Sequence, residues 1–85
     1  MSLEFRYARS FLEDLKNLDP ENYQQVYDLV FVKLKKINYL NELPQLRRLS
    51  KSQIFYRFNV ENYMIGIEVT GQIIKFIRIM PQSIV

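Results

Sequence analysis

The stretch that decides the fold covers residues 54–80 and reads IFYRFNVENYMIGIEVTGQIIKFIRIM. It contains three runs in which bulky apolar side chains alternate with others, a pattern typical of strands with one buried face. The runs cover residues 54–59, 63–69 and 72–80, with turns at residues 60–62 and at Thr70-Gly71. Pro81 ends the last run, because proline cannot donate to a strand ladder. We therefore predict three consecutive antiparallel strands.

In the first half of the chain, the apolar residues mostly recur with the 3.6-residue period of a helix rather than the two-residue period of a strand. Residues 3–7 still alternate and predict a short first strand. The run Ser10-Phe11-Leu12-Glu13 fits a capping box and predicts a helix over residues 9–17. Asp19-Pro20 predicts a second helix start, because Asp19 can cap the helix and proline loses no needed hydrogen bond there. An apolar stripe extends this second helix over residues 20–38.

The order of elements is β-α-α-β-β-β, with a connector over residues 39–52. This order predicts an α+β fold, in which a helical hairpin packs on one face of a twisted antiparallel sheet. With 85 residues the chain has room for a single domain, residues 1–85. No apolar run approaches the ~20 residues that a membrane span needs, and the N-terminus lacks a signal-peptide core. We therefore expect a cytoplasmic protein that does not enter membranes.

The composition removes several classes of chemistry. The chain has no cysteine and no histidine. Disulfides, the common zinc sites and the Ser–His or Cys–His nucleophile pairs are therefore excluded. We expect no metal site and no cofactor, so any catalysis must use Lys, Arg, Tyr, Asp or Glu.

Positive charge is concentrated in the second half of the chain. Residues 1–46 hold six basic and seven acidic side chains, a net charge of −1, whereas residues 47–85 hold six basic and two acidic ones, a net charge of +4. This asymmetry suits a polyanion or an acidic protein partner, although a solvated basic face would produce the same counts.

Five basic residues form the candidate site. Three lie on the connector and two on the predicted sheet: Arg47, Arg48, Lys51, Arg57 and Arg78. Alternation places Arg57 opposite to the apolar face of its strand, beside Met64, Gly66 and Glu68. Arginines on an uncovered sheet face can hold phosphates through charge-assisted hydrogen bonds. Nearby aromatic side chains could stack on bases, and the candidates are Phe55, Tyr56 and Tyr63.

A structural interpretation of the same residues stays open at this point. Arg57 could pair with Glu68 across the sheet and thereby lose its free charge. Most of the aromatic side chains would then belong to the core, because alternation places them on the buried face.

The ordered set of strings resembles the RelE/ParE superfamily of bacterial type II toxins over nearly the whole chain. Residues 10–18 (SFLEDLKNL) look like the first helix of that superfamily, and residues 43–49 (LPQLRRL) look like its basic connector. Residues 56–58 (YRF), 62–69 (NYMIGIEV) and 76–79 (FIRI) look like its three consecutive strands.

This resemblance implies a RelE-like ribonuclease-toxin fold and a cognate antitoxin that neutralises the toxin. We predict that this antitoxin is acidic. It also implies an endoribonuclease that cleaves mRNA without a metal, in some members on the ribosome, and so inhibits translation. Arg57 then matches a catalytic position. Arg47, Arg48 and Lys51 match RNA-binding positions in character. Arg78 matches a commonly basic strand position and is the fourth predicted RNA contact.

Two positions differ from the usual ribonuclease pattern. Met64 stands where these members place an arginine, and residues 81–83 (PQS) stand where they place a basic pair. These differences favour an alternative, in which a non-enzymatic member only binds its antitoxin or inhibits DNA gyrase. A third hypothesis is a general nucleic-acid-binding domain, which would show a steep salt dependence of binding.

Overall fold

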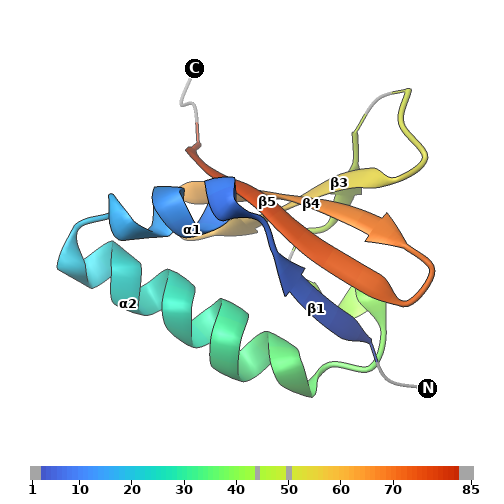
Figure 1. Cartoon of the computed structure of the whole chain (residues 1–85), viewed down its shortest axis with the longest axis horizontal. Coiled ribbons are helices and arrows are strands. Elements are labelled where there is room, and N and C mark those ends of the chain that lie inside the picture. The colour runs from blue at the N-terminus through green and yellow to red at the C-terminus, as the bar shows by residue number, and fades with distance from the viewer. Residues whose placement is uncertain (1–2, 44, 50, 83–85) are drawn as a thin grey trace.

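The computed structural model describes residues 3–43, 45–49 and 51–82. Pro44 and Ser50 of the predicted connector, and residues 83–85, lie outside the described residues. The strands are β1 (Glu4–Tyr7), β2 (Arg47–Arg48), β3 (Phe55–Val60), β4 (Tyr63–Thr70) and β5 (Ile73–Pro81), and the α-helices are α1 (Arg9–Lys16) and α2 (Pro20–Asp28). Helical turns continue α2 through Leu29–Lys33 and Leu34–Lys36, and a further short turn covers Leu40–Glu42. The predicted α+β class is confirmed (Figure 1).

The sheet has five strands in the order β1-β5-β4-β3-β2. The three predicted strands form its antiparallel centre, and the turn at Gly71 adopts a left-handed φ of 58°, which glycine tolerates without strain. Two details differ from the sequence prediction. β1 runs parallel to β5, so that the sheet is not wholly antiparallel. The connector also contains a strand, because β2 pairs with β3 at the opposite edge.

The two helices form a hairpin, which packs on one face of the sheet (Figure 1). The predicted cap at Asp19 is confirmed, since its carboxylate accepts a hydrogen bond from the Asn22 amide at 2.9 Å. The capping box at Ser10 is wrong, because α1 begins after Ala8 and Ser10 donates to the Ile77 carbonyl of β5 at 2.6 Å. A tertiary hydrogen bond has replaced the local one.

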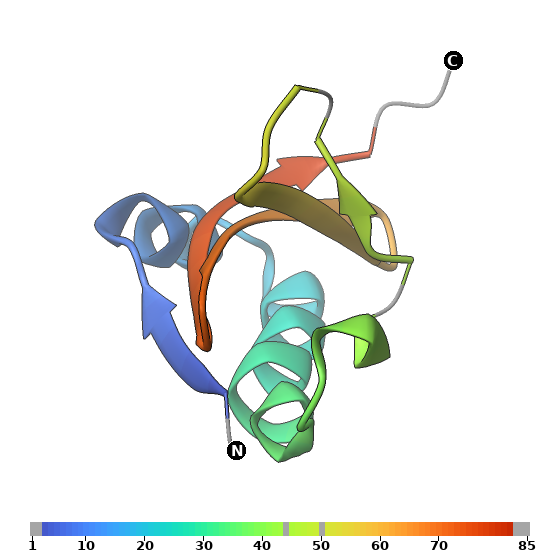
Figure 2. The ribbon, with the colours of Figure 1, turned by 90° about the vertical axis from the view of Figure 1, so that its right-hand side faces the viewer.

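The core fills the space between this hairpin and the sheet, and Figure 2 shows the sheet curving partly around the helix that begins at α2. Its largest side chains are those of Phe11, Phe58 and Phe76, all fully buried. Tyr7 stacks against Phe31 and Phe76, with ring centroids 4.6 Å and 5.3 Å away. Its hydroxyl is buried without a hydrogen-bond partner among the described residues, and burial raises its pKa.

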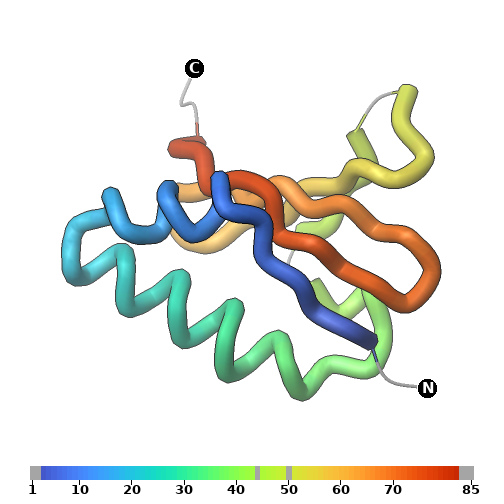
Figure 3. The backbone as a smooth tube through the Cα atoms, in the orientation of Figure 1, coloured from blue at the N-terminus to red at the C-terminus, as the bar shows by residue number. Residues whose placement is uncertain are grey.

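The other face of the sheet is covered by none of the described helices, and we call it the open face. The smooth trace of Figure 3 shows the loop between β2 and β3 extending away from the helical layer. Alternation assigns to the open face the side chains that flank each buried position of β3, β4 and β5. None of the described helices has both the length and the apolar character needed to cross a bilayer.

Candidate nucleic-acid interface

Four residues lie in register across the middle of the open face. Arg47 on β2 pairs with Arg57 on β3, Arg57 pairs with Gly66 on β4, and Gly66 pairs with Arg78 on β5. Directly opposed residues of antiparallel strands project from the same face. We call this set the arginine row. It places three guanidinium groups on one surface, with a gap at the glycine, as the alternation around Arg57 predicted.

Arg47 and Arg57 form a like-charge pair, and directly opposed like charges destabilise a sheet. Among the described residues, no carboxylate forms an ion pair with either of them. The predicted competitor Glu68 pairs in register with Phe55 and Lys75 instead, and it makes no ion pair with Arg57. The structural interpretation of Arg57 as a cross-strand salt bridge is therefore wrong.

Arg57 is half-buried, and its Nη1 atom donates to the Met64 sulfur at 3.3 Å. A thioether is a weak acceptor without charge. It orients the guanidinium and leaves its positive charge uncompensated. Met64, which stands where an arginine was expected, therefore helps to orient the Arg57 guanidinium.

The remaining connector cations occupy different positions. Arg48 pairs in register with Tyr56, whose side chain belongs to the core face, so Arg48 projects from the opposite side of β2 to Arg47. Lys51 lies in the loop before β3 and adopts a left-handed φ of 65°, which is uncommon for a residue with a side chain. Both side chains are exposed. They stay predicted RNA contacts, at the edge of the arginine row.

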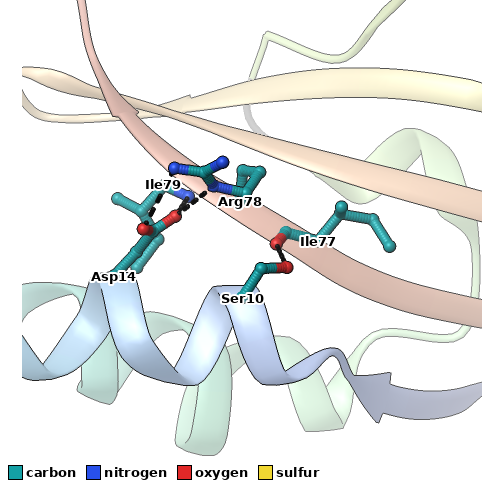
Figure 4. Close-up of polar contacts among 5 residues, drawn as sticks. All are labelled: Ser10, Asp14, Ile77, Arg78 and Ile79. Carbon is teal, nitrogen blue, oxygen red and sulfur yellow. Dashed lines mark hydrogen bonds and ion pairs between the residues drawn. The ribbon is translucent and has the colours of Figure 1, made fainter.

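Arg78 is held by α1. Its Nε atom donates to Asp14 Oδ2 at 2.7 Å and its Nη2 atom donates to Asp14 Oδ1 at 3.3 Å (Figure 4). The Ile79 amide also donates to Asp14 Oδ2, at 2.9 Å. Partial burial of Asp14 acts to raise its pKa, but the hydrogen bonds from Arg78 and Ile79 outweigh it and hold the pKa below its usual value. The predicted RNA contact at Arg78 thus comes from a guanidinium that already has a carboxylate partner.

These contacts explain how α1 completes the edge of β5. β1 stops at Tyr7, opposite Phe76. Beyond that point the Ile77 carbonyl accepts from Ser10, and the Ile79 amide donates to Asp14 (Figure 4). Two side chains one helical turn apart therefore replace the backbone of a neighbouring strand. They also flank an irregularity in the β4–β5 register, where β5 has one extra residue opposite Gly66 and Ile67.

An apolar hollow of about 170 Å³ lies beside the arginine row. Apart from Arg78, its walls are apolar or aromatic: Leu49, Phe55, Tyr56, Gly66, Ile67, Ile77 and Met80. Of the three aromatic candidates, Phe55 projects from the open face and is 40% exposed, whereas Tyr56 and Tyr63 pack against the core. The hollow could not be predicted from the sequence, because Leu49, in the loop after β2, closes it beside residues of β3, β4 and β5.

Comparisons with known proteins agree with this description. No established family model matches the chain. Toxin RelE3 of Methanocaldococcus jannaschii is 33% identical over 78 residues, which cover 91% of this chain and 88% of that toxin. The RelB–RelE antitoxin–toxin complex from Methanococcus jannaschii contains a chain with a TM-score of 0.75 and 30% identity, over 89% of this chain and 88% of that one. The archaeal RelE–RelB complex from Pyrococcus horikoshii also gives a TM-score of 0.75, at 16% identity over the full length of both chains, and shows the same fold.

Proposed function

The chain belongs to the RelE family of toxins and is the toxin component of a toxin–antitoxin system, and we propose that it acts by cleaving RNA on the open face. The observation that carries the proposal is the arginine row. Arg47 and Arg57 are directly opposed on the open face and form no ion pair with a described residue, so their repulsion costs stability. A bound polyanion removes that cost, because a phosphate between the two guanidinium groups turns repulsion into attraction.

The reaction requires no group that the chain lacks. The RNA 2′-oxygen attacks the adjacent phosphorus, the new O2′–P bond forms, and the P–O5′ bond breaks. The products are a 2′,3′-cyclic phosphate and a 5′-hydroxyl. The 2′-hydroxyl proton passes to solvent, and the departing 5′-oxygen takes a proton from solvent.

The residues contribute charge and position rather than acid–base catalysis. Arginine stays protonated, so Arg57 stabilises the negative charge that builds up on the phosphoryl oxygens. One such preorganised donor contributes about 2.7–4 kcal/mol to the transition state, or a factor of about 10²–10³ in rate. Arg47 binds the same phosphate or the next one, and Arg48 and Lys51 bind flanking phosphates from the edge.

The partner is an antitoxin, as in the RelB–RelE complex of Methanococcus jannaschii. We propose that it is acidic, because the second half of this chain has a net charge of +4, from six basic and two acidic side chains. An acidic segment bound over the arginine row would both neutralise the charges of Arg47 and Arg57 and exclude RNA from that surface.

The test is induced expression without the antitoxin, with RNA cleavage mapped by primer extension. We expect growth arrest and new RNA ends for the wild type, and neither for Arg57→Ala. Arg9→Ala is the matched control, because Arg9 is an exposed arginine of α1 whose only described partner is Glu13. Arrest without RNA cleavage, accompanied by loss of DNA supercoiling, would contradict the proposal and favour the gyrase alternative.

A further inference from the structure

The hollow beside the arginine row has a shape and a chemistry that the cleavage reaction itself does not use. It contains room for one planar ring system, in about 170 Å³. Its floor is Gly66, where a Cβ atom would lie 3.8 Å from the Met80 methyl group. A side chain larger than alanine at this position would project into the hollow. The glycine has no left-handed φ to explain it, so open space is the feature that its missing side chain provides.

The walls favour a flat apolar ligand. Phe55 presents its ring from β3 and Met80 presents its thioether from β5, and each remains about 40% exposed, 40% and 38% respectively. Leaving such side chains in water is unfavourable, and both flank the same space. Methionine adapts to irregular contacts and packs well against aromatic rings.

The arginines beside the hollow favour a ligand in which the ring is attached to an anionic group. Arg57 lies opposite Gly66 on one side of the floor, and Arg78 lies opposite Gly66 on the other. A ligand that enters the hollow therefore lies beside Arg57, which makes no ion pair with a described residue, whereas the charge of Arg78 is balanced by Asp14. Single-stranded nucleic acid suits this arrangement, because it carries a π-faced base next to a phosphate.

We propose that the hollow binds one unpaired base of the RNA, in the nucleotide adjacent to the phosphate that Arg57 holds. The inference rests on the proposed function and adds a base-stacking subsite to it, built from Phe55, Met80 and the space above Gly66. Stacking on Phe55 fixes the sugar of that nucleotide, and so helps to bring its 2′-oxygen into line with the scissile bond.

The experiment measures binding of a pentanucleotide RNA with a 2′-O-methyl group at each position, so that no 2′-hydroxyl is available for cleavage. One series replaces each base in turn by an abasic site, and fluorescence anisotropy gives the affinity. For the wild type we expect one abasic position to weaken binding about tenfold or more. Phe55→Ala should weaken binding of the intact RNA by a similar factor, and should be insensitive to the abasic site at that one position.

Two further variants make the result specific. Gly66→Val places a branched side chain in the hollow while keeping a residue that suits a strand, and it should reproduce the loss seen with Phe55→Ala. Tyr27→Ala removes an aromatic side chain of equal exposure, 40%, from α2, and it should bind RNA as the wild type does. Circular dichroism of each variant verifies that it is folded.

RNA binding by the open face and base binding by the hollow are distinguished by these variants. If Arg57→Ala weakens RNA binding but Phe55→Ala and Gly66→Val bind as the wild type does, the hollow does not take a base, whereas the RNA-binding face stands. If Arg57→Ala binds RNA as tightly as the wild type, the proposed function is wrong, and the base subsite falls with it.

Discussion

Removing the Asp14 carboxylate should destabilise the protein more than any other single change to a polar surface group. Asp14 accepts three hydrogen bonds, two from Arg78 and one from the Ile79 amide, and its side chain is only 19% exposed. In Asp14→Ala the Ile79 amide loses its partner at the edge of β5, and leaving such a group unsatisfied costs about 1–3 kcal/mol. The Arg78 side chain is 55% exposed, so solvent screening makes its part of the loss small.

We therefore expect Asp14→Ala to lower the free energy of unfolding by about 2 kcal/mol. For a domain of this size that corresponds to a decrease of roughly 10 °C in Tm. Asp14→Asn should lower the free energy of unfolding less than Asp14→Ala, because an amide oxygen can still accept from the Ile79 amide. Arg78→Ala should also lower it less, because the Arg78 side chain is largely exposed to solvent.

The assay is urea unfolding at pH 7, followed by far-UV circular dichroism. Asp28→Ala is the matched control, because Asp28 accepts only an exposed hydrogen bond from Gln24 among the described residues. The control should stay within about 0.5 kcal/mol of the wild type. If Asp14→Ala and Asp28→Ala unfold at the same urea concentration, the reasoning that α1 side chains complete the β5 edge is refuted.

Four further outcomes follow from the same contacts. The pKa of Asp14 is lower in the folded state than its usual 3.8. The ionised Asp14 therefore stabilises the fold fully above pH 3.8, and this stabilisation is lost as the pH falls through the folded pKa. In an acid titration of stability, Asp14→Ala should lack this loss. Tyr7→Phe removes a buried hydroxyl that has no hydrogen-bond partner among the described residues, and it should raise the free energy of unfolding by about 1 kcal/mol in urea; a decrease would contradict this. Arg47→Ala should weaken RNA binding more than Arg48→Ala, because only Arg47 shares the face of Arg57; equal losses by anisotropy would contradict that register. Binding of single-stranded RNA should fall with salt at a log–log slope of about −2 if three phosphates are contacted, and a flat response would exclude phosphate contacts.

The central strands could be predicted from the sequence because their signal is local. Alternation of apolar and polar residues over β3, β4 and β5 fixed which side chains face the core, and it placed Arg57 on the open face correctly. The cap at Asp19 was equally readable, because an N-cap depends on residues three positions apart.

The features that escaped prediction depend on partners far along the chain. Ser10 and Asp14 bond to β5 across 67 and 64–65 residues, and nothing in the local pattern of α1 distinguishes these bonds from a capping box. β2 has only two residues, both arginine, which is too short and too polar for a strand signal. The direct opposition of Arg47 and Arg57 became visible only with the register.

The candidate site was therefore half predictable. The residue types and the face of Arg57 came from the sequence, whereas the separation of Arg47 from Arg48 and the ion pair of Arg78 needed the fold. The hollow needed the fold most, because its lining combines a loop residue, Leu49, with residues of three neighbouring strands, β3, β4 and β5.

The measurement that tests the central claim most directly is a titration of the protein with an uncleavable single-stranded RNA, monitored at the arginine Nε–Hε resonances by NMR. If the open face binds the phosphates, the signals of Arg47 and Arg57 move together and saturate at the same RNA concentration, while those of Arg6 and Arg9, which pair with Glu4 and Glu13 at the first strand and helix, stay in place. Equal shifts for all arginines, or shifts confined to Arg6 and Arg9, would contradict the account.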